Sequence, residues 1–249
     1  MPLELSIIVP VYNERKNIEP TVTKIVDCFS NQLDRMEILF VDDDSPDGTA
    51  EEVLRISKSI EQVRLVKNGL KEGLGSAHKA GYEAAEGEYI LTIDADFSQS
   101  PQDLLNIKNK IDEGYDLVIG SRYMRDGDQI GKSFLKDSGS RFINYVCRYL
   151  LGVKLKDCTH GCRGFRRDVF EKIKDKLDTK GHPSFVIQFA FWSYAYKMRC
   201  TEIPVSFKER PSGMGESKIS IRKEVPPFLA LTTRLVFTRI ARRFNISNK

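Results

Sequence analysis

The sequence predicts an α/β fold in which a mostly parallel sheet is flanked by helices. Short apolar runs rich in Val, Ile and Leu recur through the first half, and stretches with helical spacing separate them. Polar residues follow the apolar runs directly. Continuous apolar strands that alternate with helices are typical of a parallel sheet covered on both faces.

The expected strands of the first half are five apolar runs, at residues 5–10, 36–42, 63–66, 89–93 and 117–120. Helical spacing between them predicts four helices, at residues 17–29, 49–59, 75–85 and 102–113. The second half is less regular, with a mobile loop expected at 126–137, helices at 140–151 and 185–197, a strand at 201–207 and a loop at 157–166. A last helix over 219–244 is expected to be interrupted near Pro226 and Pro227.

Composition excludes several classes of protein. The chain has 249 residues, of which 41% are hydrophobic and 30% charged, so a disordered chain, a collagen and a disulfide scaffold are excluded. Its five scattered cysteines predict reduced thiols. No window approaches 18 uninterrupted apolar residues, and the first residues lack the layout of a secretory signal.

Charge is concentrated at the carboxyl end. Residues 208–249 hold ten Lys and Arg against three Asp and Glu, while the rest holds 29 against 32. Such a basic tail predicts an anionic partner, either nucleic acid or an anionic membrane, and charge alone does not choose. Residues 228–244 mix apolar residues with Arg239 and Arg243, which suits a helix at a membrane interface, against a partner or against the body.

Polar residues gather where the expected strands end. Tyr12 and Glu14 follow the first strand, residues 42–49 the second, Asp94 and Asp96 the fourth, and Arg122 the fifth. Because parallel strands end at the same edge of a sheet, we expect these residues on one rim, where open α/β sheets bind ligands.

Two carboxylates at positions i and i+2, Asp94 and Asp96, can both turn toward one hard cation such as Mg²⁺ or Mn²⁺. The alternative is a pair of turn-forming, helix-capping aspartates before Pro101. Residues 42–49 contain more aspartates than a turn needs, and these can accept hydrogen bonds from a base or ribose. Arg122 either faces an anion or pairs with an aspartate.

Two glycine-bearing segments give weaker signals. Residues 73–77 predict either a tight loop that lets a helix pack closely or a weak phosphate site. Residues 213–218, with Arg210 before them and Lys218 at their end, could close over a phosphate or form an ordinary turn.

Together the motifs resemble those of family 2 glycosyltransferases with the GT-A fold, and among them the dolichyl- and polyprenyl-phosphate mannose synthases. The resemblance is carried by VPVYNERKNI (9–18), VDDDSPDGTA (41–50), GLGSA (73–77), DADFSQSP (94–101), GSRY (120–123), DCTHGCRGFRRDV (157–169) and GMGESK (213–218). It implies a GT-A (Rossmann-like) catalytic domain over residues 1–218 and a basic membrane-interface helical tail, with C-terminal interfacial helices, over residues 219–249.

The resemblance also implies roles for individual residues. It assigns the nucleotide-sugar site to Pro10, Tyr12, Glu14, Val41, Asp43, Asp94, Ala95, Asp96, Arg210 and Lys218. The implied ligands of Mg²⁺ or Mn²⁺ are Asp94, Asp96 and Ser98. The lipid phosphate is assigned to Arg122, Lys136 and Ser140, and the catalytic residues to Asp96 and Arg122.

The implied activity is transfer of mannose from GDP-mannose to dolichyl or polyprenyl phosphate, with inversion. It implies a peripheral enzyme at the cytoplasmic face of a membrane, or one tethered by a segment absent from this chain. Small transmembrane partner subunits fit this picture, and nucleic acid does not.

Three alternatives compete with this activity. The first is hexosyl transfer from a UDP-sugar to polyprenyl phosphate. The second is a saccharide-directed transferase, which needs a carboxylate base; Ala190 stands where many relatives have glutamate. The third is a nucleotide-binding regulator on an inactive fold, which the intact pair Asp94 and Asp96 argues against.

Overall fold

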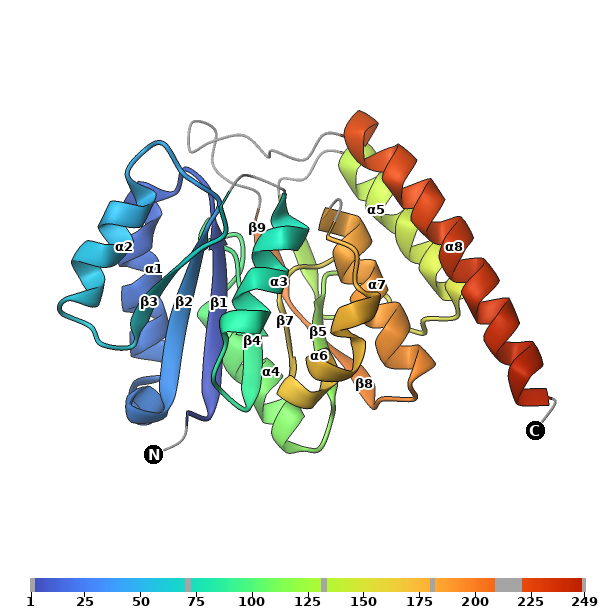
Figure 1. The fold of residues 1–249 in the computed structure, drawn as a ribbon, viewed down its shortest axis with the longest axis horizontal. Coiled ribbons are helices and arrows are strands. Elements are labelled where there is room, and N and C mark those ends of the chain that lie inside the picture. Colours follow the sequence, from blue (N-terminus) through green and yellow to red (C-terminus); the bar gives the residue numbers. More distant parts are fainter. Residues whose placement is uncertain (1–2, 70–72, 131–133, 180–181, 209–220, 248–249) are drawn as a thin grey trace.

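The computed structural model describes residues 3–69, 73–130, 134–179, 182–208 and 221–247. Its centre is a seven-stranded sheet in the order β3-β2-β1-β4-β7-β5-β8 (Figure 1). These strands are β1 (Leu5–Val11), β2 (Met36–Asp42), β3 (Val63–Lys67), β4 (Tyr89–Thr92), β5 (Leu117–Ser121), β7 (Arg163–Arg166) and β8 (Cys200–Pro204). All run parallel except β7, which is antiparallel to both of its neighbours. The predicted mostly parallel α/β sheet is confirmed.

Helices cover both faces of the sheet, as Figure 1 shows. One face is covered by α1 (Arg15–Cys28), α2 (Thr49–Ser57) and α4 (Pro101–Asp112). The other is covered by α3 (Leu74–Ala84), α6 (Arg167–Ile173) and α7 (His182–Ala195), with α5 (Phe134–Val146) and α8 (Ile221–Ser247) packed outside α7. Short helical turns at η1 (Ser30–Arg35) and η3 (Lys174–Lys176), and a π-helical segment at η2 (Cys147–Leu151), complete the helices of the described residues.

Alternation along the strands divides the apolar core into two halves. In β1, Ile7 and Val9 pack with α1, α2 and α4, whereas Ile8 packs with α3 and α7. The same alternation separates Phe40 from Val41 in β2. Because both faces are buried, the strands are apolar at nearly every position, which is why their sequence signal was strong.

The antiparallel strand β7 corrects the expectation of a loop at 157–166. It lies between β4 and β5, with Thr92 opposite Arg163 on one side and Ile119 opposite Arg163 on the other. Its sequence, RGFR, has no apolar run. The strand forms because two neighbouring edges supply hydrogen bonds to its backbone, which is tertiary rather than local information.

Three further expectations for the second half are corrected. The expected loop at 126–137 contains the short strand β6 (Asp128–Ile130), which pairs with β9 (Ser206–Lys208), and includes the start of α5. The expected single strand at 201–207 is divided between β8 and β9. Helix α8 runs continuously through Pro226 and Pro227, because the φ of proline is itself helical and only two N–H donors are lost. In the described part of the chain, no helix is long and apolar enough to cross a membrane.

Candidate active site

The segments that follow β1, β2, β4 and β5 meet at one rim of the sheet, as expected, because these strands are parallel. Hydrogen bonds join the first two segments. The backbone N–H of Asn13 donates to Oγ of Ser45 over 3.0 Å, and that of Arg15 to Oδ2 of Asp47 over 3.2 Å. The segments after β1 and β2 are therefore joined to each other at the rim.

The residues assigned to a nucleotide are distributed between the core and the rim. Pro10 and Val41 are buried within β1 and β2. A Cβ added at Gly81 in α3 would lie 2.9 Å from Cγ2 of Val41. The Val41 side chain is therefore packed under a helix, and only its backbone can face a ligand.

The polar members of this group lie at the rim. Tyr12 is half-buried, and Glu14 is buried, with its side chain accepting a hydrogen bond of 2.6 Å from Nδ2 of Asn17. Asp43 is buried and accepts a hydrogen bond of 2.6 Å from Nδ2 of Asn68. These bonds orient the two carboxylates at the ends of neighbouring strands.

The loop after β4 holds Asp94 and Asp96 in a strained conformation. Nε2 of Gln99 donates to Oδ2 of Asp94 over 2.7 Å, and the backbone N–H of Ser98 donates to Oδ1 of Asp96 over 3.0 Å. Phe97, which lies between Asp96 and Ser98, has a φ of 59°, which is unusual for a bulky residue. Strain of this kind persists only where the surroundings enforce it, and it is concentrated at functional sites.

Helix α1 supports this loop from outside. Oγ1 of Thr21 donates to the carbonyl oxygen of Ala95 over 3.4 Å, and Nζ of Lys24 lies 3.9 Å from the centre of the Phe97 ring. The cation–π contact covers one face of the ring that has the unusual φ. Neither Thr21 nor Lys24 was predicted from the sequence.

The acidic loop fits a hard divalent cation. Asp94, Asp96 and Ser98 alternate along it, and Oγ of Ser98 is buried without a hydrogen-bond partner among the described residues. Mg²⁺ and Mn²⁺ prefer such oxygen donors and usually share their ligands with substrate phosphates. No group of three or more His, Cys, Asp and Glu side chains in the described ranges could hold a metal.

Arg122, directly after β5, is paired with an aspartate, the alternative that the sequence left open. Its Nε and Nη2 donate to the two oxygens of Asp157 over 2.7 and 2.9 Å, and Nη2 also donates to Oγ1 of Thr159 over 2.9 Å. The Arg122 and Asp157 side chains are 7% and 0% exposed. Burial opposes both charges, but their attraction outweighs it, raising the pKa of Arg122 and lowering that of Asp157.

Asp157 is a further residue of the candidate site that the sequence analysis did not single out. Nδ2 of Asn144 in α5 donates to it over 3.3 Å, and its backbone N–H donates to Oε1 of Glu202 in β8 over 2.8 Å. The signal in the sequence that could have pointed to it is its position as the acidic first residue of the DCTHGC motif. Its position 35 residues beyond Arg122 became meaningful only with β7 in place.

The remaining predicted residues are placed only in part. Ala95 is buried next to Asp94 and Asp96, and Ser140 is half-buried in α5. Lys136 belongs to α5, but its side chain, like all of Arg210 and Lys218, lies outside the described residues. The ligand roles of the whole set stay predictions.

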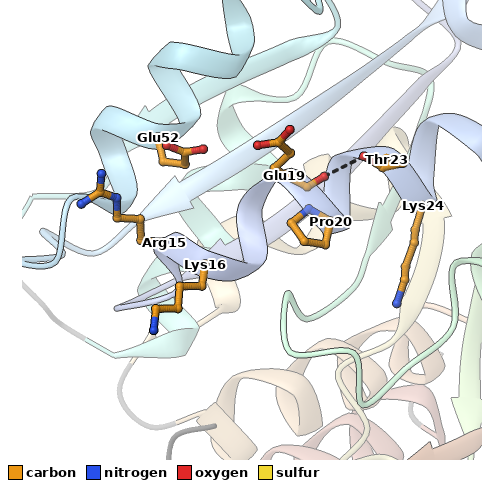
Figure 2. A pocket seen from close by; sticks show the side chains of 7 residues that line it. All are labelled: Arg15, Lys16, Glu19, Pro20, Thr23, Lys24 and Glu52. Atoms are coloured by element: carbon orange, nitrogen blue, oxygen red, sulfur yellow. Dashed lines mark hydrogen bonds between the residues drawn. The ribbon is translucent and has the colours of Figure 1, made fainter.

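A surface hollow of about 770 Å³ lies outside the rim, along α1 and α2 (Figure 2). Its lining residues are Arg15, Lys16, Glu19, Pro20, Thr23, Lys24 and Glu52. Arg55 forms ion pairs with both Glu19 and Glu52, over 2.6 and 2.7 Å. Acids and bases are thus mixed along the hollow, and none of its lining residues is among the predicted ligand residues.

Comparison with known proteins identifies the class. Residues 6–174 match Glycosyl transferase family 2, and the chain belongs to this family. Among its relatives, a polyprenol monophosphomannose synthase from Mycolicibacterium smegmatis is 35% identical over 221 residues, covering 86% of this chain and 80% of the relative. An undecaprenyl-phosphate mannosyltransferase from Micrococcus luteus is 31% identical over 217 residues, covering 86% of each.

Solved structures agree with the GT-A-like fold. Glucosyl-3-phosphoglycerate synthase from Mycobacterium tuberculosis superposes with a TM-score of 0.63 at 17% identity, covering 96% of this chain and 80% of that one. A complex of that synthase with Mn²⁺, UDP and glucosyl-3-phosphoglycerate has the same scores and coverage. At this identity the likeness shows the fold.

Proposed function

We propose that the protein transfers mannose from GDP-mannose to dolichyl or polyprenyl phosphate with inversion at the anomeric carbon. The observation that carries the proposal is the rim, where an oxygen-rich acidic loop and a buried arginine follow parallel strands. The names of the two mannosyl-transferring relatives support the sugar and the lipid class. A UDP-sugar donor is the alternative, because the described site does not distinguish the two bases.

The reaction needs little acid–base chemistry from the protein. The second pKa of a phosphate monoester is near 6, so the acceptor oxygen is already ionised at neutral pH. That oxygen attacks the anomeric carbon as the bond from this carbon to the nucleoside diphosphate breaks, and a single displacement inverts the centre. The protein therefore has to align the reactants and stabilise the leaving diphosphate.

Asp94, Asp96 and Ser98 would hold Mg²⁺ or Mn²⁺, which would supply charge stabilisation to the leaving diphosphate. The acidic loop would hold its oxygens in place before substrate arrives, because Gln99 and the Ser98 backbone orient both carboxylates. Ala95 would meet the donor through its backbone. Glu14 and Asp43 would face the nucleoside from the neighbouring strand ends.

Arg122 would orient the acceptor phosphate. The Arg122–Asp157 pair is neutral as a unit, so it offers guanidinium N–H donors with little net charge. The net positive charge would come from Lys136, Arg210 and Lys218, with Ser140 as a further donor. This division of roles separates geometry, supplied by a buried pair, from net positive charge, supplied by other lysine and arginine side chains.

The test is transfer of radiolabelled sugar to a polyprenyl phosphate in detergent, with GDP-mannose and UDP-glucose compared, each with Mn²⁺ or EDTA. We expect Mn²⁺-dependent labelling from GDP-mannose and a β-linked product. Labelling from UDP-glucose alone would show that the donor is a UDP-sugar rather than GDP-mannose. An α-linked product would contradict a single displacement. A lipid product formed equally well in EDTA would contradict the metal.

We also propose peripheral attachment to the cytoplasmic face of a membrane, through the helical tail at 219–249 and its neighbours. Seven exposed large apolar side chains support this, and together they form what we call the apolar edge: Phe142, Tyr145, Tyr149, Leu150, Leu229, Phe237 and Ile240. They belong to α5, η2 and α8, which lie together at one side of the molecule (Figure 1). Nη1 of Arg239 in α8 donates to the carbonyl oxygens of Tyr149 and Leu150.

Vesicle binding tests the attachment. We expect binding to vesicles of neutral and anionic phospholipid that is weakened by salt, through the basic tail, and by the double change Tyr145→Ser and Tyr149→Ser, through the apolar edge. Leu54→Ser is the matched control, since Leu54 is an exposed apolar residue of α2 on the opposite side. The proposal would be refuted if binding did not change with salt or with the double tyrosine substitution. It would also be refuted if Leu54→Ser weakened binding equally.

A further inference from the structure

The largest fully buried side chain in the described structure carries a charge. Arg163, the first residue of β7, is 0% exposed. Among the described residues no ion pair includes it. A buried guanidinium without a carboxylate is costly, and an apolar residue of similar volume would avoid that cost. The presence of an arginine here therefore requires an explanation other than core packing.

Two hydrogen bonds of the guanidinium tie a rim segment to a helix. Nη2 of Arg163 donates to the carbonyl oxygen of His160 over 2.6 Å, and Nη1 donates to that of Val186 in α7 over 3.2 Å. The planar fork spans the two carbonyl groups, which a point charge cannot do equally well. Burial lowers the pKa of Arg163, and nearby Tyr82 and the Cys158 thiol oppose this.

The segment held in this way is residues 157–162, which we call the dividing segment. Because β7 runs antiparallel between β4 and β5, the residues before it lie where those two strands end. The carbonyl oxygen of Cys162 accepts a hydrogen bond of 2.9 Å from the backbone N–H of Gly120. The dividing segment thus lies between the acidic loop and Arg122.

Each end of the dividing segment contacts one side of the site. A Cβ placed on Gly161 would lie 3.6 Å from Oδ2 of Asp94 and 3.9 Å from Nε2 of Gln99. Gly161 therefore backs the carboxylate and the amide that orients it. At the other end, Asp157 holds Arg122 through two hydrogen bonds.

We propose that Arg163 is a positioning residue that holds the dividing segment on α7, and thereby sets the placement of Asp94 relative to Arg122. The inference rests on the proposed function, because it assigns the metal ligand and the phosphate-orienting residue from there. Arg163 touches neither substrate nor metal. It acts through the His160 carbonyl and the backbone of Gly161.

The test compares Arg163→Met and Arg163→Lys with Phe170→Leu, a fully buried apolar residue of the same core. Three quantities are measured: the thermal midpoint, the calorimetric binding of Mn²⁺ with GDP and with UDP, and kcat and KM for the lipid acceptor. Mutation of a residue that supports a metal ligand typically lowers metal affinity or activity about 10- to 100-fold.

For Arg163→Met we expect binding of the Mn²⁺–nucleotide pair to weaken about 10-fold and kcat to fall by more than KM rises. Arg163→Lys should recover part of both losses, because its ammonium keeps the charge and can reach one carbonyl. Phe170→Leu should lower the thermal midpoint and leave the binding constant and kcat near those of the wild type.

Wild-type binding and kcat in a less stable Arg163→Met protein would overturn the proposal and leave Arg163 a core residue only. If that variant fails to fold, Arg163→Lys decides the question, and unchanged binding and kcat would overturn the proposal as well. A wild-type protein that binds no Mn²⁺–nucleotide pair with either base would instead contradict the proposed function.

Discussion

The two charged sides of the rim are built in opposite ways. The acidic loop is held by its own neighbours in sequence, since Asp94 is bonded to Gln99 and Asp96 to the backbone of Ser98. Arg122 is held by Asp157, 35 residues away, in a pair that is almost fully buried. One side is a local structure whose two carboxylates are half-buried, and the other is a tertiary structure in which the Arg122 side chain keeps an exposed fraction of 7%.

This difference teaches which carboxylate, Asp157 or Asp96, contributes mainly to folding and which mainly to chemistry. Removing one partner of a buried ion pair leaves an unpaired buried charge, which destabilises the fold strongly. The carboxylate of Asp96 is half-buried and accepts a hydrogen bond from the backbone of Ser98, which is neutral. Changes at Asp157 should therefore appear first as lost stability, and changes at Asp96 first as lost activity.

The largest effect is expected for Asp157→Ala, which strands the Arg122 guanidinium. We expect a loss of about 3–5 kcal/mol in the free energy of unfolding, measured by urea denaturation at pH 7.5. Glu171→Ala is the control, because its ion pair with Lys174 is exposed, and its loss should be several-fold smaller. Equal losses for the two variants would show that the buried pair is no more stabilising than a surface pair.

Asp96→Asn should have the reverse signature. The amide keeps the shape of the carboxylate but removes the charge, so kcat in the radiolabel assay should fall about 10²- to 10³-fold. Unfolding stability should stay within about 0.5 kcal/mol of the wild type. Asp175→Asn, at an exposed position in η3, serves as the activity control. A fully active Asp96→Asn enzyme would show that the charge of Asp96 is not needed for the reaction.

The dependence of stability on pH distinguishes the buried Arg122–Asp157 pair from the imidazole of His160. Burial, followed by the nearby Arg122 charge, lowers the pKa of His160 from 6.5 to about 3. The unfolded chain therefore binds a proton at this residue below pH 6.5 while the folded chain does not. Stability should decline as pH falls from 6.5 toward 3, by at most about 1.4 kcal/mol per pH unit for this residue.

The carboxylate of Asp157 behaves differently, because its pKa is lowered from 3.8. Its contribution to stability is complete above pH 3.8 and is lost only as pH falls toward the lowered value. Urea midpoints at pH 7.5, 6.0 and 5.0 should therefore decline less steeply in His160→Gln than in the wild type. Parallel declines in the two proteins would place the acid sensitivity elsewhere, for example at His78, whose pKa is lowered to about 4 by burial.

The smallest effect, with opposite signs in two assays, is expected for Ser98→Ala. The change removes a buried hydroxyl that has no partner among the described residues, so stability should be unchanged or higher by less than about 1 kcal/mol. The Mn²⁺ concentration for half-maximal activity should rise several-fold, because one oxygen donor is lost. Unchanged Mn²⁺ dependence would exclude Ser98 as a ligand.

Sequence patterns predicted the regular half of this fold well. The strands from β1 to β5 and helices α1 to α4 combine period, apolar runs and turn residues that agree with one another. Asp94, Asp96 and Arg122 could be found because each directly follows a strong strand signal. Local pattern was enough to locate these residues at the ends of strands, whereas the partner that holds Arg122 is 35 residues away.

The features that were missed depend on contacts distant in sequence. β7 has a charged, glycine-containing sequence and forms only between two existing strands. Asp157 gains its partners from Arg122 after β5, from α5 and from β8, and Arg163 donates to a carbonyl group of α7. The prolines of α8 predicted a break, but proline tells against an N–H bond rather than against helical dihedrals.

The antiparallel strand also has a consequence for how the chain is made. While residues up to about 160 are emerging from a ribosome, β4 and β5 have no strand between them, and each presents an unpaired edge. The acidic loop can already exist at that stage, but the dividing segment cannot yet be held in place by β7. β7 must be synthesised before β4 and β5 can be joined in one sheet. We therefore expect nascent chains stalled ahead of residue 163 to be especially prone to pairing their exposed strand edges with other chains.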